Sequence, residues 1–205
     1  MSSMLREVQL VVEDELSEAV LRKLVNHSAH NLSIYGVYLT GGFGKIKSNI
    51  ERFKNASNAM PHIVLTDLDR HECVPSMLKN WGVGTIPQGL LFRVAVCEVE
   101  AWLLADREGF AKYLNLPLTK IPQYPEQESD PKQVLFNVVR KCKKRRLVEE
   151  IVPAAGSSAS LGPLYNQRMC GFVRESWNIQ RASINSDSLT RAIARITVFM
   201  QHNET

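Results

Sequence analysis

The sequence has few cysteines and no long apolar run. It contains 205 residues with 4 cysteines, none of them paired in the C-x-x-C spacing typical of a zinc or redox site. We therefore expect free, mostly buried thiols rather than disulfides. No stretch is apolar enough to span a bilayer, and the N-terminus has no signal-peptide pattern. These absences predict a cytoplasmic protein that does not associate with a membrane.

The net charge of +4 is small, but the charges are unevenly distributed along the chain. Acidic residues cluster early, and a basic run follows much later. The basic run consists of Lys141, Lys143, Lys144, Arg145 and Arg146. An acidic site and a basic patch on one chain suit an enzyme that acts on a polyanion, and the run could contact a phosphate backbone. They also suit two ordinary solvated surfaces, so charge alone decides nothing.

Apolar runs and helical patterns alternate through the first half of the chain. Strands are predicted at residues 8–12, 32–39, 62–66 and 89–97, with helices between them, and the first and third of these strands are expected to be buried. This order predicts an α/β fold with a Rossmann-like, mostly parallel four-stranded sheet flanked by helices.

The second half has a different pattern. Residues 117–131 contain four prolines and predict an irregular connection, and helices are predicted at residues 131–151, 161–177 and 188–202. We find no internal repeat. The expected organisation is an α/β core over residues 1–112 and a helical extension over residues 113–205 that packs on the core.

Three of the predicted strands end in acidic side chains. Glu13 follows the first, Asp67 and Asp69 follow the third, and Glu98 and Glu100 follow the fourth. The carboxyl ends of parallel strands meet at one edge of a sheet, where ligands bind. Clustered carboxylates repel each other, and a hard cation such as Mg²⁺ or Mn²⁺ relieves that repulsion. The alternative is that these acids cap the helices that follow them.

The residues around these acids resemble a known pattern. A strand ending in Glu, here V-E-D-E-L-S-E-A-V-L, and a later strand ending in D-x-D, here V-L-T-D-L-D, form the signature of TOPRIM domains. More closely, the chain resembles a bacterial family of unknown function in the TOPRIM-like superfamily, related to the TOPRIM domain of overcoming-lysogenization-defect (OLD) nucleases. That resemblance rests on R-V-A-V-C-E-V-E-A-W-L-L-A-D at residues 93–106 and on D-P-K at residues 130–132.

The resemblance implies a role for each acid. Glu13 would be the TOPRIM glutamate, Asp67 and Asp69 would bind metal, and Glu98 or Glu100 would help to hold a second cation. The chain departs from the common pattern at Asp14, which replaces the usual glycine. Asp14 either adds a ligand or weakens an anion site.

The favoured function is a Mg²⁺- or Mn²⁺-dependent nuclease or phosphotransfer enzyme acting on nucleic acid, with DNA favoured over RNA. Glu13 would hold metal or act as a general acid or base. Lys45, after a glycine-rich turn that is not a Walker A loop, and Arg70 would neutralise phosphate charge or be solvated. His71 is either a proton shuttle or structural.

A second hypothesis keeps the same fold without independent catalysis. Relatives of this family are often encoded beside ATPases, and this chain has no nucleotide-binding loop of its own. It would then be a subunit or toxin partner of an ABC- or AAA-type ATPase acting in trans, with phage defence as a setting by analogy. A small-molecule phosphate enzyme and a homodimer are also left open.

Overall fold

The structure is a computed structural model and describes residues 6–28, 32–68, 71 and 73–202. Its contacts divide the chain into two compact units: unit 1 comprises Met1–Val96 and Thr190–Thr205, and unit 2 comprises Cys97–Leu189. The division falls after residue 96, whereas the domain boundary expected from the sequence follows residue 112. Helix α5 explains this position, because it packs on the helices that follow it in the chain.

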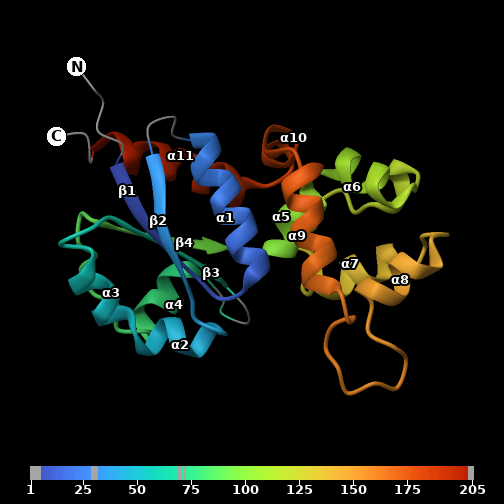
Figure 1. The fold of residues 1–205 in the computed structure, drawn as a ribbon, viewed down its shortest axis with the longest axis horizontal. Coiled ribbons are helices and arrows are strands. Elements are labelled where there is room, and N and C mark those ends of the chain that lie inside the picture. Colours follow the sequence, from blue (N-terminus) through green and yellow to red (C-terminus); the bar gives the residue numbers. More distant parts are fainter. Residues whose placement is uncertain (1–5, 29–31, 69–70, 72, 203–205) are drawn as a thin grey trace. The chain divides into compact units, whose positions relative to one another are not determined.

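Unit 1 is the α/β part of the chain. Its four strands are all parallel, in the order β2-β1-β3-β4, and helices flank the sheet, so the predicted fold class is confirmed (Figure 1). Its elements are β1 Arg6–Val12, α1 Glu15–Ser28, β2 Leu32–Leu39, α2 Phe43–Ser48, α3 Ile50–Ala56, β3 His62–Asp67, α4 Val74–Asn80 and β4 Leu90–Ala95.

The central strands of unit 1 are buried on both faces. Val11 on β1 and Val64 on β3 face a cluster that includes side chains of α2, α3 and α4. Side chains alternate along a strand, so the neighbours of Val11 and Val64 point to the opposite face. There α1 covers the sheet with Leu16, Val20 and Leu24, which recur at helical spacing and are buried (Figure 1). Parallel pairing of β1 with β3 between these two layers places the carboxyl ends of the two strands next to each other.

The regular elements of unit 2 are all helices. Its core includes Trp102 and Trp177, whose indole N–H groups donate to Ser188 Oγ (2.7 Å) and to the Trp102 carbonyl (3.0 Å). Its elements are α5 Val99–Ala105, α6 Arg107–Leu114, η1 Leu118–Lys120, η2 Pro125–Gln127, α7 Pro131–Val139, α8 Arg145–Ile151, α9 Tyr165–Glu175 and α10 Ile179–Ile184, and α11 Asp187–His202 starts here and continues into unit 1.

The predicted single helix over residues 131–151 is wrong, because the chain forms α7 and α8 with a break at Cys142. The Cys142 thiol is buried and donates to the Leu114 carbonyl (3.1 Å). A continuous helix would also place the cations of the basic run three and four residues apart, which is unfavourable. The break relieves this repulsion and buries Cys142.

All four cysteines are thiols rather than disulfides, as the sequence predicts. Cys142 and Cys170 are buried, whereas Cys73 is exposed. No helix in the described ranges combines the length and the apolar character needed to cross a membrane.

Candidate functional site

Glu13 and the end of β3 lie together at the carboxyl edge of the sheet in unit 1. Because β1 and β3 are neighbouring parallel strands, Glu13 after β1 is beside Asp67, the last residue of β3. The Thr66 hydroxyl and the Asp67 backbone N–H (3.1 Å) both donate to Glu13 Oε1. These two bonds fix the Glu13 carboxylate next to Asp67. Of the convergence expected from the strand order, the contact between Glu13 and the end of β3 is present, while metal binding by Glu13 and Asp67 stays a prediction.

Asp14 has a structural task. Its Oδ1 accepts from the Ser17 N–H (2.8 Å), in the first turn of α1. A carboxylate in this position satisfies an N–H group that has no partner within the helix. The acid that replaces the usual glycine thus caps α1, a role distinct from the two that the sequence left open.

Asp69 and Arg70, two predicted site residues, lie outside the described residues. Within the described ranges, no group of three or more His, Cys, Asp or Glu side chains lies close enough together to hold a metal ion. Asp69, which the sequence places two positions after Asp67, stays a predicted ligand.

The glycine-rich turn lies beside Glu13. The Gly41 N–H donates to the Glu13 carbonyl (2.9 Å), and Gly41 and Gly42 have φ values of 71° and 129° that favour glycine. Lys45 is exposed on α2, and its Nζ lies 3.4 Å from where a Cβ at Gly41 would stand. The Lys45 ammonium therefore lies over the turn that contacts Glu13, a position suited to neutralising a nearby anion.

In unit 2, Glu98 and Glu100 are brought together by a lysine rather than by strand geometry. Strand β4 ends at Ala95, and Cys97 has a left-handed φ of 62°, so the strand expected over residues 89–97 is shorter than predicted and does not lead directly into the two acids. Glu98 instead precedes α5 as its N-cap residue, and Glu100 lies in the first turn. The Lys132 Nζ lies 3.2 Å from Glu98 Oε1 and 3.3 Å from Glu100 Oε1.

Glu100 is a buried acid with an unsatisfied oxygen. Its side chain is 2% exposed, and its Oε1 accepts from the Tyr165 hydroxyl (2.7 Å). Its Oε2 is buried without a hydrogen-bond partner among the described residues. Burial raises the pKa of Glu100, and the Lys132 ammonium partly offsets this effect. A buried oxygen of this kind is a suitable acceptor for a cation or a donor group.

The D-P-K segment explains how Lys132 reaches the two acids. The Asp130 side chain accepts from the Gln133 N–H (2.8 Å) and caps α7, and Pro131 occupies the first helical position, which suits proline. Lys132 follows, and its backbone N–H also donates to Glu98 Oε2 (2.9 Å). In the sequence, this segment served only as part of the resemblance. The dipeptide D-P is typical of a helix start and could have predicted that α7 begins here.

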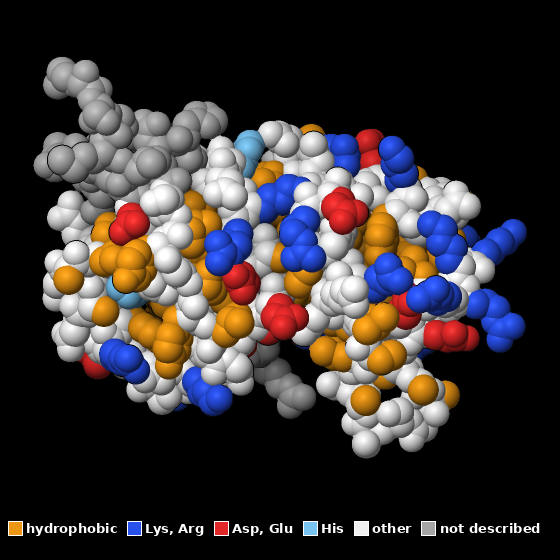
Figure 2. Space-filling view, in the orientation of Figure 1, with side chains coloured by type: hydrophobic (Ala, Val, Ile, Leu, Met, Phe, Trp, Pro, Cys, Tyr) orange, Lys and Arg blue, Asp and Glu red, His pale blue; other side chains and the backbone are white. Residues whose placement is uncertain are grey.

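The basic run lies between α7 and α8 and in the first turn of α8. Its five cations are exposed, and Figure 2 shows Lys and Arg side chains gathered over the end of unit 2 that carries α8. Two members have specific partners: the Lys144 Nζ donates to the Tyr113 carbonyl (3.0 Å), and the Arg146 Nε donates to Glu150 (2.9 Å). Their contact with nucleic acid stays a prediction.

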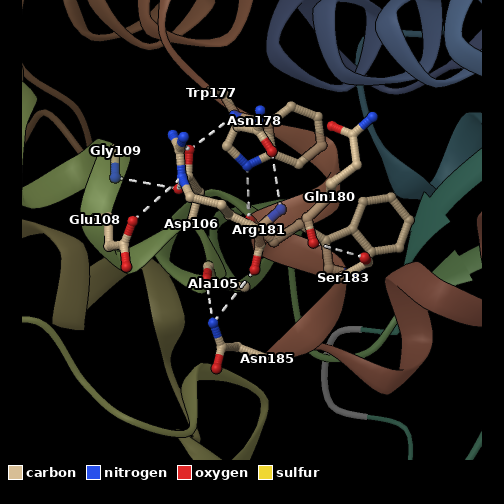
Figure 3. Close-up of polar contacts among 11 residues, drawn as sticks. Ala105, Asp106, Glu108, Gly109, Trp177, Asn178, Gln180, Arg181, Ser183 and Asn185 are labelled. Carbon is tan, nitrogen blue, oxygen red and sulfur yellow. Dashed lines mark hydrogen bonds and ion pairs between the residues drawn. The ribbon is translucent and has the colours of Figure 1, made fainter.

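Asp106, the last residue of the resemblance segment, has a structural role that the sequence did not reveal. It is fully buried and accepts from the backbone N–H groups of Gly109 (3.1 Å) and Asn178 (2.7 Å) (Figure 3). Arg181 on α10 adds donors from Nε (2.7 Å) and Nη2 (2.9 Å), and these bonds raise the pKa of Arg181. Asp106 therefore joins the start of α6 to α10.

Comparison with known proteins returned structural similarities alone. No protein-family profile matches the sequence, and no curated protein does. The chain is similar to the C-terminal region of the Burkholderia pseudomallei OLD protein, with 14% identity, 82% of this chain and 97% of that chain covered, and a TM-score of 0.38. It is also similar to the C-terminal region of the Xanthomonas campestris pv. campestris OLD protein, with 16% identity, 82% and 94% coverage, and a TM-score of 0.33. At these values the similarity assigns no activity to this chain.

Proposed function

We propose that the chain is a Mg²⁺- or Mn²⁺-dependent nuclease or related phosphotransfer enzyme acting on nucleic acid. The observation that carries this proposal is the Glu13 carboxylate, held against the end of β3 by Thr66 and the Asp67 N–H. Two acids from separate strands thus lie at the edge of the sheet where α/β folds bind ligands. The TOPRIM-like pattern of the sequence supports the same interpretation.

The acids present fit a hard divalent cation. Glu13 and Asp67, with Asp69 two residues later, would supply oxygen ligands in unit 1. In unit 2, Glu98 and Glu100 are further candidates, and the unsatisfied Oε2 of Glu100 favours the latter. A cation bound to such ligands would supply charge stabilisation at a scissile phosphate and a more acidic water.

The chain's own cations would complement these acids. Lys45, over the turn beside Glu13, and Arg70 would bind and orient a phosphate group. Lys132 holds Glu98 and Glu100 in place by neutralising their mutual repulsion. Glu13 acts as a ligand or as the group that accepts a proton from water.

The test is cleavage of nucleic acid by the purified full chain. Wild type is incubated with plasmid or single-stranded DNA and with Mn²⁺, Mg²⁺ or EDTA, beside Asp67→Asn and Glu149→Gln. Glu149 is an exposed acid on α8 and serves as the matched control. We expect cation-dependent cleavage by wild type and the control, and a loss of at least about 100-fold for Asp67→Asn.

The variants also detect a contaminating nuclease, because such an enzyme would cleave equally in every preparation. Calorimetry with Mn²⁺ separates binding from catalysis. If wild type neither cleaves DNA with either cation nor binds Mn²⁺, the proposal is wrong.

A further inference from the structure

A pocket lined mainly by cationic side chains lies in unit 2, apart from Glu98 and Glu100. Residues of α8, α9 and the end of α6 surround a pocket of about 350 Å³. Its lining comprises Tyr113, Lys144, Arg146, Leu147, Glu150 and Arg168. Three of these side chains are cationic and one is acidic, so the lining carries an excess of two positive charges. Such an excess around a hollow attracts an anion.

Glu150 holds two of these cations side by side. Its carboxylate is 9% exposed, and it accepts from the Arg146 Nε (2.9 Å) and from the Arg168 Nε (2.7 Å), with Arg168 Nη2 at 2.6 Å. Burial opposes ionisation of Glu150, but the hydrogen bonds from the two arginines outweigh it and lower its pKa. The acid is therefore charged at neutral pH and fixes the directions of both guanidinium groups.

Both arginines keep donors for a ligand. Among the described residues, the Arg146 guanidinium donates only through Nε, and its side chain is 87% exposed. Arg168 is 37% exposed and bonds Glu150 through Nε and Nη2. Since a guanidinium has five N–H donors in a planar fork, each retains N–H groups that suit a phosphate.

The other walls of the pocket are also held in place. The Lys144 Nζ is fixed by the Tyr113 carbonyl, and the Tyr113 ring packs against Phe172 with 5.1 Å between centroids. The Tyr113 hydroxyl donates to the Arg168 carbonyl (3.4 Å), and burial raises the pKa of this phenol, so it stays protonated. Tyr113 and Leu147 give the pocket an apolar side next to its cations.

We propose that this pocket binds a backbone phosphate of a nucleic acid, with Arg146, Arg168 and Lys144 as contacts and Glu150 as a positioning residue. The choice of nucleic acid rests on the proposed function. It is favoured over a lone phosphate because the exposed cations Lys141, Lys143 and Arg145 extend the positive surface beyond the pocket. A chain of phosphates can neutralise all of these charges at once.

The test is binding measured by fluorescence anisotropy, with labelled single-stranded and duplex DNA, in EDTA and at several salt concentrations. For Arg168→Ala and Lys144→Ala we expect a Kd about five- to tenfold higher than for wild type, and a salt slope smaller by about one. The matched controls are Arg174→Ala, on the same helix as Arg168, and Lys120→Ala, both at exposed positions. These are expected to stay within about twofold of wild type.

Glu150→Gln distinguishes positioning from simple charge. The substitution makes the pocket more positive, so binding would tighten if only net charge mattered. We expect it to weaken, because the two arginines lose the carboxylate that orients them. Thermal melting checks that each variant folds.

Absence of DNA binding by wild type, pocket variants that bind as tightly as wild type, or controls that lose as much affinity would each overturn the proposal. Because EDTA keeps the assay free of divalent cations, its failure is distinct from failure of the nuclease proposal. A chain that binds DNA through this pocket but neither cleaves it nor binds Mn²⁺ would contradict only the nuclease proposal.

Discussion

Glu13 and Asp14 are neighbours in the chain, but their carboxylates have different partners. Asp14 accepts from Ser17 in the first turn of α1, whereas Glu13 accepts from Thr66 and Asp67 on the adjacent strand. The difference follows from the point at which β1 ends, because the chain turns there into a helix that needs a cap. The location of an acid directly after a strand therefore does not tell whether the acid caps the next helix or is a candidate metal ligand.

Glu150 provides a residue-scale prediction about pH. Its pKa is lowered in the folded chain, so its ionised form adds stability above its ordinary pKa of 4.5, and that contribution is lost as pH falls through the folded value. Wild type is expected to lose stability more steeply than Glu150→Gln between about pH 5 and about pH 3. Urea unfolding midpoints of the two proteins across this range measure the difference, and parallel pH profiles would contradict the prediction.

Among the elements, helix starts connect distant parts of unit 2. Asp130 caps α7 and thereby places Lys132 beside Glu98, and Glu126 accepts from the Asp187 N–H (3.0 Å) and the Ser188 N–H (3.1 Å) at the start of α11. Each of these acids satisfies N–H groups that a helix cannot pair internally. The helices are therefore positioned by their first turns as well as by their apolar faces.

The Asp106 junction gives a prediction at this scale. Asp106→Ala leaves two backbone N–H groups and the Arg181 guanidinium without their acceptor, so we expect it to lower the free energy of unfolding by about 2–4 kcal/mol. Gly109→Ala is expected to act in the same direction, because its Cβ would stand 2.2 Å from Asp106 Oδ2. Chemical denaturation measures both effects.

Glu108→Ala is the matched control for this junction. Its carboxylate lies 3.9 Å from the Arg181 Nε and is 73% exposed, so its loss is expected to cost less than about 0.5 kcal/mol. An Asp106→Ala protein as stable as the control would show that the junction contributes nothing.

The strands were predictable from the sequence because they are short runs rich in apolar and β-branched or aromatic residues. The predicted second strand coincides with β2, and the predicted third differs from β3 only by Asp67. The site in unit 2 was less predictable. Cys97 turns the chain before Glu98, and the break at Cys142 depends on burial against Leu114, which is distant in sequence. Local patterns do not contain such long-range contacts.

At the scale of the whole molecule, the candidate residues belong to different compact units. Glu13, Lys45 and Asp67 lie in unit 1. Glu100 and the pocket lined by Lys144, Arg146 and Arg168 lie in unit 2. Each unit has its own buried residues, so each candidate ligand can be substituted in the unit that contains it. This separation allows cation binding to be assigned to a unit by measurement.

A cation that binds the folded chain stabilises it in proportion to the logarithm of its concentration, by about 2.7 kcal/mol at about 100 times its Kd. For a chain of 205 residues, this corresponds to a rise in Tm of about 5–10 °C with saturating Mn²⁺. We expect EDTA to reverse the rise and Asp67→Asn to abolish most of it, because that variant loses a ligand in unit 1. If the rise persists in Asp67→Asn and disappears in Glu100→Gln, the cation binds in unit 2. If calorimetry shows no rise in the Tm of wild type with Mn²⁺, the acids of this chain do not form a metal site.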